Sequence, residues 1–127
     1  RKALRHYLGR VFATAASLTL GLGVYDTQCG AKLFRASAAT QALFQRPFVT
    51  RWLVDVEILA RLIQTRRGTP LPQAEEVIYE LPLPKWHDVA GSKVKGRDFA
   101  KGLFELARIY WQYLRPRAPL RAPPPDA

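Results

Sequence analysis

The segment from Tyr25 to Arg35 reads YDTQCGAKLFR and is the most informative stretch of this 127-residue chain. It sets a carboxylate, an amide and a thiol in a short polar turn, between an apolar run that ends at Val24 and the apolar pair Leu33 and Phe34. Gly30 lets the backbone of this turn come close to another group. The turn therefore presents chemically useful side chains, although a polar turn without a function has the same composition.

The length and charge of the chain limit what it can be. With 127 residues it has room for one domain or part of one. Its net charge of +10 favours an anionic partner. The candidate classes are a nucleic acid, an acidic membrane surface and a phosphorylated ligand. The single cysteine, Cys29, excludes an internal disulfide and a Cys-rich metal site. Because the chain has no Met and opens on Arg1, we expect it to be a piece of a longer polypeptide.

Apolar spacing and turn residues predict a mixed order of helices and short strands. Ser37 is the predicted N-cap of the second helix, and Pro82 limits the second strand to a sheet edge or a strand end. Two short strands are too few for an independent doubly wound sheet. We therefore expect this chain to be the second half of a larger α/β sheet. The predicted helices cover residues 1–20, 37–44, 51–64 and 98–114, and the predicted strands cover residues 31–34 and 77–83.

The two ends of the chain are basic. The helix over residues 1–20 is amphipathic, and such a helix can rest on anionic lipid head groups. The alternative is a helix packed on its own domain with a solvated basic side. The apolar run over residues 11–24 is too short to cross a bilayer alone, which takes about 20 apolar residues. The Pro-rich tail over residues 115–127 is expected to be disordered or extended.

Two further segments accompany the first turn: RWLVDVEIL at residues 51–59 and WHDVAGSK at residues 86–93. In this order and spacing, the three motifs resemble the C-terminal half of family 2 glycosyltransferases of the dolichyl-phosphate glucosyltransferase type. The resemblance covers residues 1–114 and implies the acceptor-side part of a GT-A fold, with amphipathic helices around a few short strands. Ala31 departs from the pattern, because a Phe is usual at that position.

The resemblance implies that Asp26 lies beside the acceptor. A phosphate acceptor is already ionised near neutral pH, so Asp26 would position the sugar or a cation and not act as a base. Gln28 would bind a sugar hydroxyl, while Lys32 and Arg35 would hold a phosphate. The structural alternatives are a turn Asp that caps backbone amides, a turn Gln, and cations that are only solvated.

The second and third motifs supply the other candidate residues. The unit Trp52-x-x-Asp55-x-Glu57 has the family's spacing, and its two carboxylates do not face each other on a helix. We expect one of them to face the sugar or a basic loop and the other to point away, with ordinary surface carboxylates as the alternative. Ser92 and Lys93 offer a hydroxyl, backbone N–H groups and a cation to a diphosphate or lipid phosphate.

The implied activity is that of an inverting, membrane-associated enzyme at the cytoplasmic face. It would move a hexose, by preference glucose, from a UDP-sugar to dolichyl or another polyprenyl phosphate, and residues 1–20 would contact an anionic membrane. Mannose- and glucose-transferring relatives share this architecture, so the motifs leave the donor sugar open. The Asp-x-Asp that would hold Mg²⁺ or Mn²⁺ does not occur in the chain, so no metal ligand is predicted here and this piece alone is expected to be inactive.

Two alternatives without catalysis also fit the composition. A basic nucleic-acid-binding module could stack bases on Trp52, Trp86 and Trp111. However, the basic residues are scattered and no recognised nucleic-acid motif occurs, so no nucleic-acid partner is expected. A peripheral membrane scaffold would use the helix over residues 1–20 without chemistry.

Overall fold

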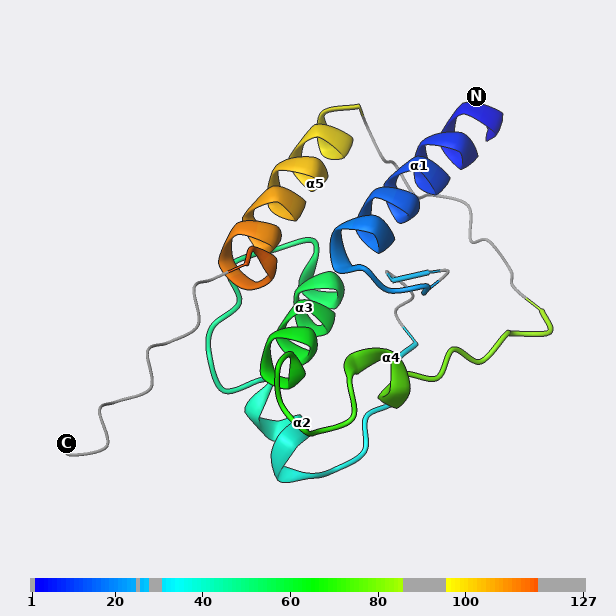
Figure 1. Ribbon diagram of the computed structural model, residues 1–127. Helices are drawn as coiled ribbons and strands as arrows, with labels where there is room; N and C mark the ends of the chain where they lie inside the picture. Colours follow the sequence, from blue (N-terminus) through cyan, green and yellow to red (C-terminus); the bar gives the residue numbers. More distant parts are fainter. Residues whose placement is uncertain (1, 25, 28–30, 86–95, 117–127) are drawn as a thin grey trace, which may run out of the picture.

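The protein structure is a computed structural model that describes residues 2–24, 26–27, 31–85 and 96–116. Figure 1 shows α1 and α5 side by side, with α3 beneath the pair and α2 and α4 beyond α3. A π-helical turn, η1, continues α5. The elements of the described residues are α1 Lys2–Leu20, α2 Ala38–Ala42, α3 Val54–Arg66, α4 Ala74–Val77, α5 Gly96–Ile109 and η1 Tyr110–Leu114.

The four predicted helices are confirmed, with shifted ends. The Ser37 hydroxyl accepts a hydrogen bond from the Thr40 amide at 3.2 Å and caps α2 as predicted. Gly21, with φ +68°, ends α1 in the left-handed conformation that glycine adopts readily. The third helix begins at Val54, three residues after the predicted start, because a side chain of α5 binds the amides of the three preceding residues.

The two predicted strands are wrong for the described residues, since neither segment forms a strand there. Residues 31–36 have no regular structure, and Val77 ends the short helix α4. Gln73 and Glu76 form a capping box that starts α4, which the strand prediction overlooked. All residues from Val77 to Leu83 except Ile78 are exposed, so this segment lacks the alternating burial of a strand on a core in the described part. The described part is therefore helical, and the GT-A assignment stays a prediction.

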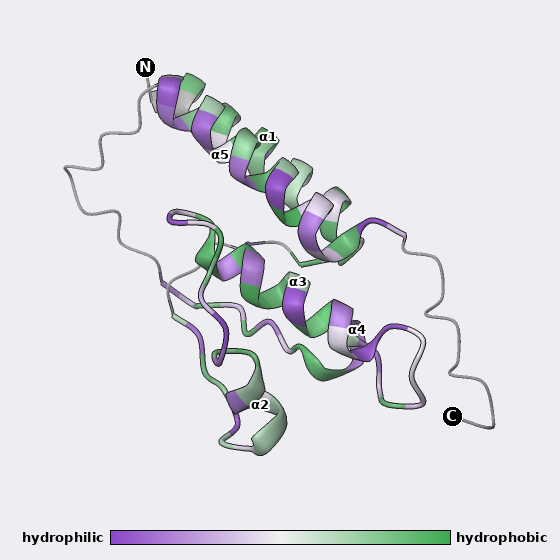
Figure 2. Ribbon diagram, turned by 90° about the vertical axis from the view of Figure 1, so that its left-hand side faces the viewer, coloured by the Kyte–Doolittle hydropathy of each residue, from purple (hydrophilic) through white to green (hydrophobic). Residues whose placement is uncertain are grey.

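One apolar core joins α1, α3 and α5 (Figure 2). In the third helix, the apolar spacing predicts a buried stripe of Leu53, Val56, Leu59, Ala60 and Ile63, and all five side chains are buried. The apolar spacing also predicts stripes on the first helix and the last helix, and these are buried only in part: Leu4, Val11, Leu103 and Tyr110 are exposed. The main buried side chains are Phe12, Ala16 and Leu20 of α1, Val56, Leu59, Ala60 and Ile63 of α3, Leu106 and Ile109 of α5, and Tyr113 of η1.

The close contact of α1 with α5 depends on a glycine. The ring of Phe12 packs edge-to-face on Phe99, with 6.1 Å between the ring centroids. The same ring covers Gly102, where an added Cβ would lie 2.9 Å from Phe12 Cε2. The absence of a side chain at Gly102 therefore sets how closely the two helices approach.

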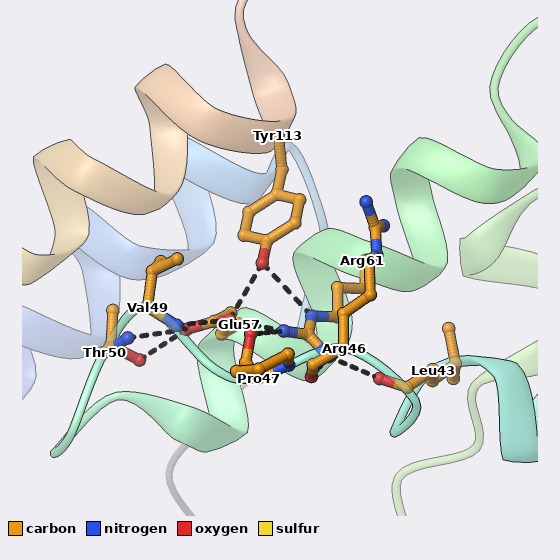
Figure 3. Close-up of polar contacts among 8 residues, drawn as sticks. All are labelled: Leu43, Arg46, Pro47, Val49, Thr50, Glu57, Arg61 and Tyr113. Carbon is orange, nitrogen blue, oxygen red and sulfur yellow. Dashed lines mark hydrogen bonds and ion pairs between the residues drawn. The ribbon is translucent and has the colours of Figure 1, made fainter.

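A buried polar network lies beneath this core (Figure 3). Glu57 of α3 is completely buried, and its carboxylate accepts hydrogen bonds from the Val49 amide, the Thr50 amide and the Thr50 hydroxyl at 2.8–3.0 Å. The Tyr113 hydroxyl donates to Glu57 Oε2 at 2.8 Å, and Arg61 Nη2 lies 3.0 Å from the same oxygen. The charge of Glu57 is thus fully compensated inside the protein.

Arg61 extends the network to the loop that precedes α3. Its guanidinium donates to the carbonyl oxygens of Leu43, Arg46 and Pro47 at 2.6–2.8 Å. Its Nε donates to the Tyr113 hydroxyl at 3.1 Å. One side chain of α3 therefore ties the irregular segment after α2 to η1, two segments that lie far apart in the sequence.

The protonation states within the network are mutually consistent. Burial pushes the pKa of Glu57 up, but hydrogen bonds from Thr50, Val49 and Tyr113 outweigh it and hold the pKa below its ordinary 4.5. Burial raises the pKa of the Tyr113 hydroxyl above its ordinary 10.0. The hydroxyl therefore stays protonated and donates a hydrogen bond to Glu57. At neutral pH the network holds one carboxylate, one guanidinium and one neutral phenol.

We expect Glu57→Gln to lower the free energy of unfolding by about 3 kcal/mol, because it leaves the Arg61 guanidinium buried without its carboxylate. Since the pKa of Glu57 is lower in the folded state, its stabilisation is full above pH 4.5 and is lost as the pH falls through the folded pKa. Urea denaturation at several pH values will measure both effects. Equal pH dependence of the variant and the parent below pH 4.5 would contradict this assignment.

Two glycine substitutions separate helix propensity from helix packing. Gly102→Ala should destabilise the protein by about 1–3 kcal/mol, because the new methyl group overlaps the Phe12 ring. Gly9→Ala is the matched control within α1, where nothing lies within 4 Å of an added Cβ. It should stabilise by about 0.5–1 kcal/mol, as alanine does in a helix interior. Thermal unfolding measures both, and a stabilising Gly102→Ala would refute the close contact.

Candidate functional site

The first and second sequence motifs meet at Lys32. Its Nζ donates to the carbonyl oxygen of Thr27 at 2.9 Å and lies 3.7 Å from Asp55 Oδ1 in the first turn of α3. The side chains of Lys32 and Asp55 are 21% and 34% exposed, so solvent reaches both. This contact brings the turn that carries Asp26 next to the start of α3.

Asp26 is exposed, and a third segment lies against its backbone. The Asp26 amide donates to Glu80 Oε1 at 2.9 Å, which places the segment after α4 beside the turn. The sequence analysis did not select Glu80. The available signal was its position as the only acidic residue in the otherwise apolar stretch over residues 77–83.

Thr27 is the other residue that the sequence analysis did not select. Its side chain is buried, and Thr27 Oγ1 has no hydrogen-bond partner among the described residues. An unsatisfied buried hydroxyl costs about 1–3 kcal/mol, so such groups are rare and mark strain, water or ligand contact. Thr27 belongs to the motif over residues 25–35, so the sequence indicated its position, but its hydroxyl was not among the predicted site groups.

The start of α3 is held by a carboxylate from α5. Glu105 accepts hydrogen bonds from the amides of Arg51, Trp52 and Leu53 at 2.9–3.1 Å. The N-cap residue Leu53 makes no side-chain cap, and Glu105 binds its amide and places a negative charge beside the N-terminus of α3, where such a charge is favoured. These hydrogen bonds fix the first helical turn of α3, which carries Asp55.

The two carboxylates of the second motif have separate roles. Asp55 faces the basic residue Lys32, and Glu57 points into the protein, which agrees with the expectation that they diverge. Glu57 is part of the buried network, and its predicted contact with substrate has no support in this structure. Trp52 is exposed, with Lys101 Nζ 5.9 Å from its ring centroid, and Arg35 is exposed as well.

The remaining predicted site residues, Gln28, Ser92 and Lys93, lie outside the described residues, as does most of the predicted tail. Two hollows of about 360 and 230 Å³ occur in the described part, and neither is lined by a predicted site residue. Within residues 2–24, 26–27, 31–85 and 96–116, no group of three His, Cys, Asp or Glu side chains could hold a metal ion. No helix of these segments combines the length and apolarity needed to cross a membrane.

Sequence comparison gives related proteins of one kind. A dolichyl-phosphate beta-glucosyltransferase of Trichomonas vaginalis is 35% identical over 109 residues, which are 86% of this chain and 29% of that protein. The enzyme of that name from Saccharomyces cerevisiae is 34% identical over 115 residues, or 90% of this chain and 31% of the relative. The Dictyostelium discoideum protein is 30% identical over 118 residues, with 90% and 32% covered.

The extent of these matches defines what they show. No protein-family model and no solved structure matches the chain. The chain spans 29–32% of the length of these three relatives. The predicted resemblance is confirmed: over 86–90% of its residues, this chain is related in sequence to the dolichyl-phosphate beta-glucosyltransferases.

Proposed function

We propose that this chain is the acceptor-side part of a glycosyltransferase that moves a hexose, by preference glucose, from a UDP-sugar to dolichyl or another polyprenyl phosphate with inversion. The observation that carries the proposal is the sequence relationship to several dolichyl-phosphate beta-glucosyltransferases over 86–90% of the chain. The same relationship favours this function over a basic nucleic-acid-binding module.

The geometry around Lys32 supports an anion-binding role. Its ammonium group is held between the Thr27 carbonyl oxygen and Asp55, so its position is set before a ligand arrives. A preorganised cation loses less side-chain freedom on binding than a freely moving one. Arg35, exposed three residues further on, would supply a second cation with two-point contact to phosphate.

Asp26 would position the sugar or a cation beside this cationic group. Asp26 is exposed. Glu80 contacts the same turn through the Asp26 amide, and Asp55 contacts it through Lys32. We assign a sugar contact to Gln28, and contact with the donor diphosphate or the lipid phosphate to Ser92 and Lys93, as the motifs imply. Mg²⁺ or Mn²⁺ would be bound mainly by parts of the enzyme outside this chain.

The GT-A assignment is part of the proposal. Leu33 is fully exposed, and the apolar side chains of Tyr79, Leu81 and Leu83 are exposed too, so both segments carry apolar surface that has no cover within the described part. In the complete enzyme these two segments would pair with strands from the part of the protein outside this chain. Residues 1–20, which form α1 from Lys2 onward, would rest on an anionic membrane at the cytoplasmic face.

Asp26→Asn in the complete protein should lower transfer of radiolabelled glucose from UDP-glucose to polyprenyl phosphate by about a hundredfold or more, because it removes a charge at the reacting groups. Glu75→Gln, on an exposed position of α4, is the matched control and should keep full transfer. Lipid-extractable label is the readout, with Mg²⁺ or Mn²⁺ present. Absence of label with glucose, mannose and N-acetylglucosamine donors would refute the proposed function.

Lys32→Ala should separate a binding role from a structural one. The ion pair with Asp55 is partly exposed and 3.7 Å long, so its loss should change the free energy of unfolding by about 1 kcal/mol or less. If Lys32 binds phosphate, the KM for polyprenyl phosphate should rise about tenfold or more. Arg46→Ala removes an exposed cation far from the turn and should leave KM unchanged. A stability loss of several kcal/mol with unchanged KM would assign Lys32 to the fold alone.

A further inference from the structure

The carboxylate of Glu105 links α5 to the segment that precedes α3. Glu105 Oε1 accepts a hydrogen bond from the Arg51 amide at 2.9 Å, and Oε2 accepts from the Trp52 and Leu53 amides, both at 3.1 Å. These three amides lie 52–54 residues earlier in the chain. Both oxygens of one side chain are therefore committed to a distant stretch of backbone.

This stretch of backbone is held by side chains because it has no regular structure of its own. The amides of residues 49 and 50 bind the Glu57 carboxylate (Figure 3), so five successive amides, those of residues 49–53, bind two carboxylates. Glu57 belongs to α3 itself, whereas Glu105 belongs to another helix. Of the two carboxylates, Glu105 is therefore the one that links the start of α3 to α5.

The first turn of α3 carries this link onward to the candidate site. Asp55 follows Leu53 by two residues, and its carboxylate lies 3.7 Å from Lys32 Nζ. The same ammonium group donates to the carbonyl oxygen of Thr27 at 2.9 Å. Two residues of chain span at most about 7 Å, so a shift of the Leu53 amide moves Asp55 with it. The place of the Lys32 ammonium group thus depends on contacts that begin at Glu105.

A stabilising cap with no effect on the site is the alternative role of Glu105. A serine, aspartate or asparagine at the N-cap position would supply such a cap locally. The chain has Leu53 there instead, whose side chain is 2% exposed and belongs to the apolar core. The N-cap position is used for packing, and the amides receive their carboxylate from α5. The start of α3 therefore depends on where α5 lies.

We propose that Glu105 is a positioning residue of the acceptor site, which is formed by Lys32 with its neighbours Asp55 and Thr27. Through the amides of residues 51–53 it holds Asp55, and through Asp55 it holds the ammonium group where the lipid phosphate binds. In this role Glu105 acts through other groups and does not contact substrate. The proposal rests on the proposed function and deepens it, because it adds a side chain of α5 that sets the affinity for the acceptor.

The kinetics of Glu105→Gln in the complete protein test the proposal. The substitution replaces one acceptor oxygen by an NH₂ donor and removes the charge, so at least one of the three hydrogen bonds is lost. A misplacement of about 1 Å at a reacting group can cost about a hundredfold. We expect the KM for polyprenyl phosphate to rise about tenfold, and the KM for UDP-glucose to change less than about twofold.

Two control variants separate this effect from a loss of stability. Glu75→Gln makes the same chemical change at an exposed position of α4, and Ile63→Val weakens the packing of α3 away from its start. Both should keep the parent KM for polyprenyl phosphate. A folded Glu105→Gln protein with the parent KM would overturn the proposal.

Glu105→Asp covers the case in which Glu105→Gln does not fold. It keeps the charge but moves the carboxylate back by one methylene group, so it should raise the same KM about threefold or more. If Glu105→Gln does not fold and Glu105→Asp has the parent KM, the positioning role is refuted.

A double variant tests whether Glu105 acts through Lys32. Lys32→Ala removes the group that Glu105 places, so the double variant with Glu105→Gln should have the KM of Lys32→Ala alone, within about twofold. Independent contributions would multiply instead, to a rise of about a hundredfold. Such a product would show that Glu105 does not act through Lys32.

Hydrogen exchange tests the contact without measuring transfer. In Glu105→Gln, at least one of the amides of residues 51–53 should exchange about tenfold or more faster than in the parent, because it loses its acceptor. The amides of residues 49 and 50 bind Glu57 and are the internal control, with unchanged exchange. Parent-like exchange at all three amides would contradict the proposal.

Failure of the proposed function has a different signature. No sugar transfer by the complete parent protein would refute the proposed function, and the positioning role would fall with it even if the exchange rates confirm the contact. Transfer by the parent, with the parent KM in Glu105→Gln, would refute the positioning role alone and leave the proposed function standing.

Discussion

The buried pair of Glu57 and Arg61 is the interaction on which the rest of this structure depends. Two opposite charges inside a protein are stable only when each is paired and fully hydrogen-bonded, and both conditions are met here by Thr50, Tyr113 and the carbonyl oxygens before α3. The Phe48 ring also lies 4.1 Å from the Arg61 guanidinium carbon and helps to shield it from water. Because the pair draws its partners from segments far apart in the sequence, it holds an irregular loop, α3 and η1 in one arrangement.

The candidate site is built on this frame. Asp55 lies two residues from Glu57, so the position of Asp55 follows from the anchoring of Glu57 and from the Glu105 carboxylate that binds the amides before α3. Lys32 then joins Asp55 to the turn that carries Asp26 and Thr27. A small number of charged contacts thus connects the buried network to the segment with Asp26 and Thr27.

The charges of the chain are divided by function. The buried carboxylate compensates a buried guanidinium, and Glu105 compensates a helix N-terminus, so these negative charges contribute little to the outer surface. The cations of α5 stay exposed beside aromatic side chains.

Local chemistry made much of this protein readable from the sequence: the spacing of apolar residues gave the four helices, Ser37 gave a cap, and the three ordered motifs gave the relationship to dolichyl-phosphate beta-glucosyltransferases. These features depend on neighbours a few residues apart. Only the tertiary structure decided that Asp55 faces Lys32 while Glu57 is buried and that Glu105 binds the amides just before α3, about fifty residues earlier. It also decided that residues 31–34 and 77–83 form no strand in the described part. The physical reason is that burial and strand pairing depend on partners distant in the sequence, which local patterns do not specify.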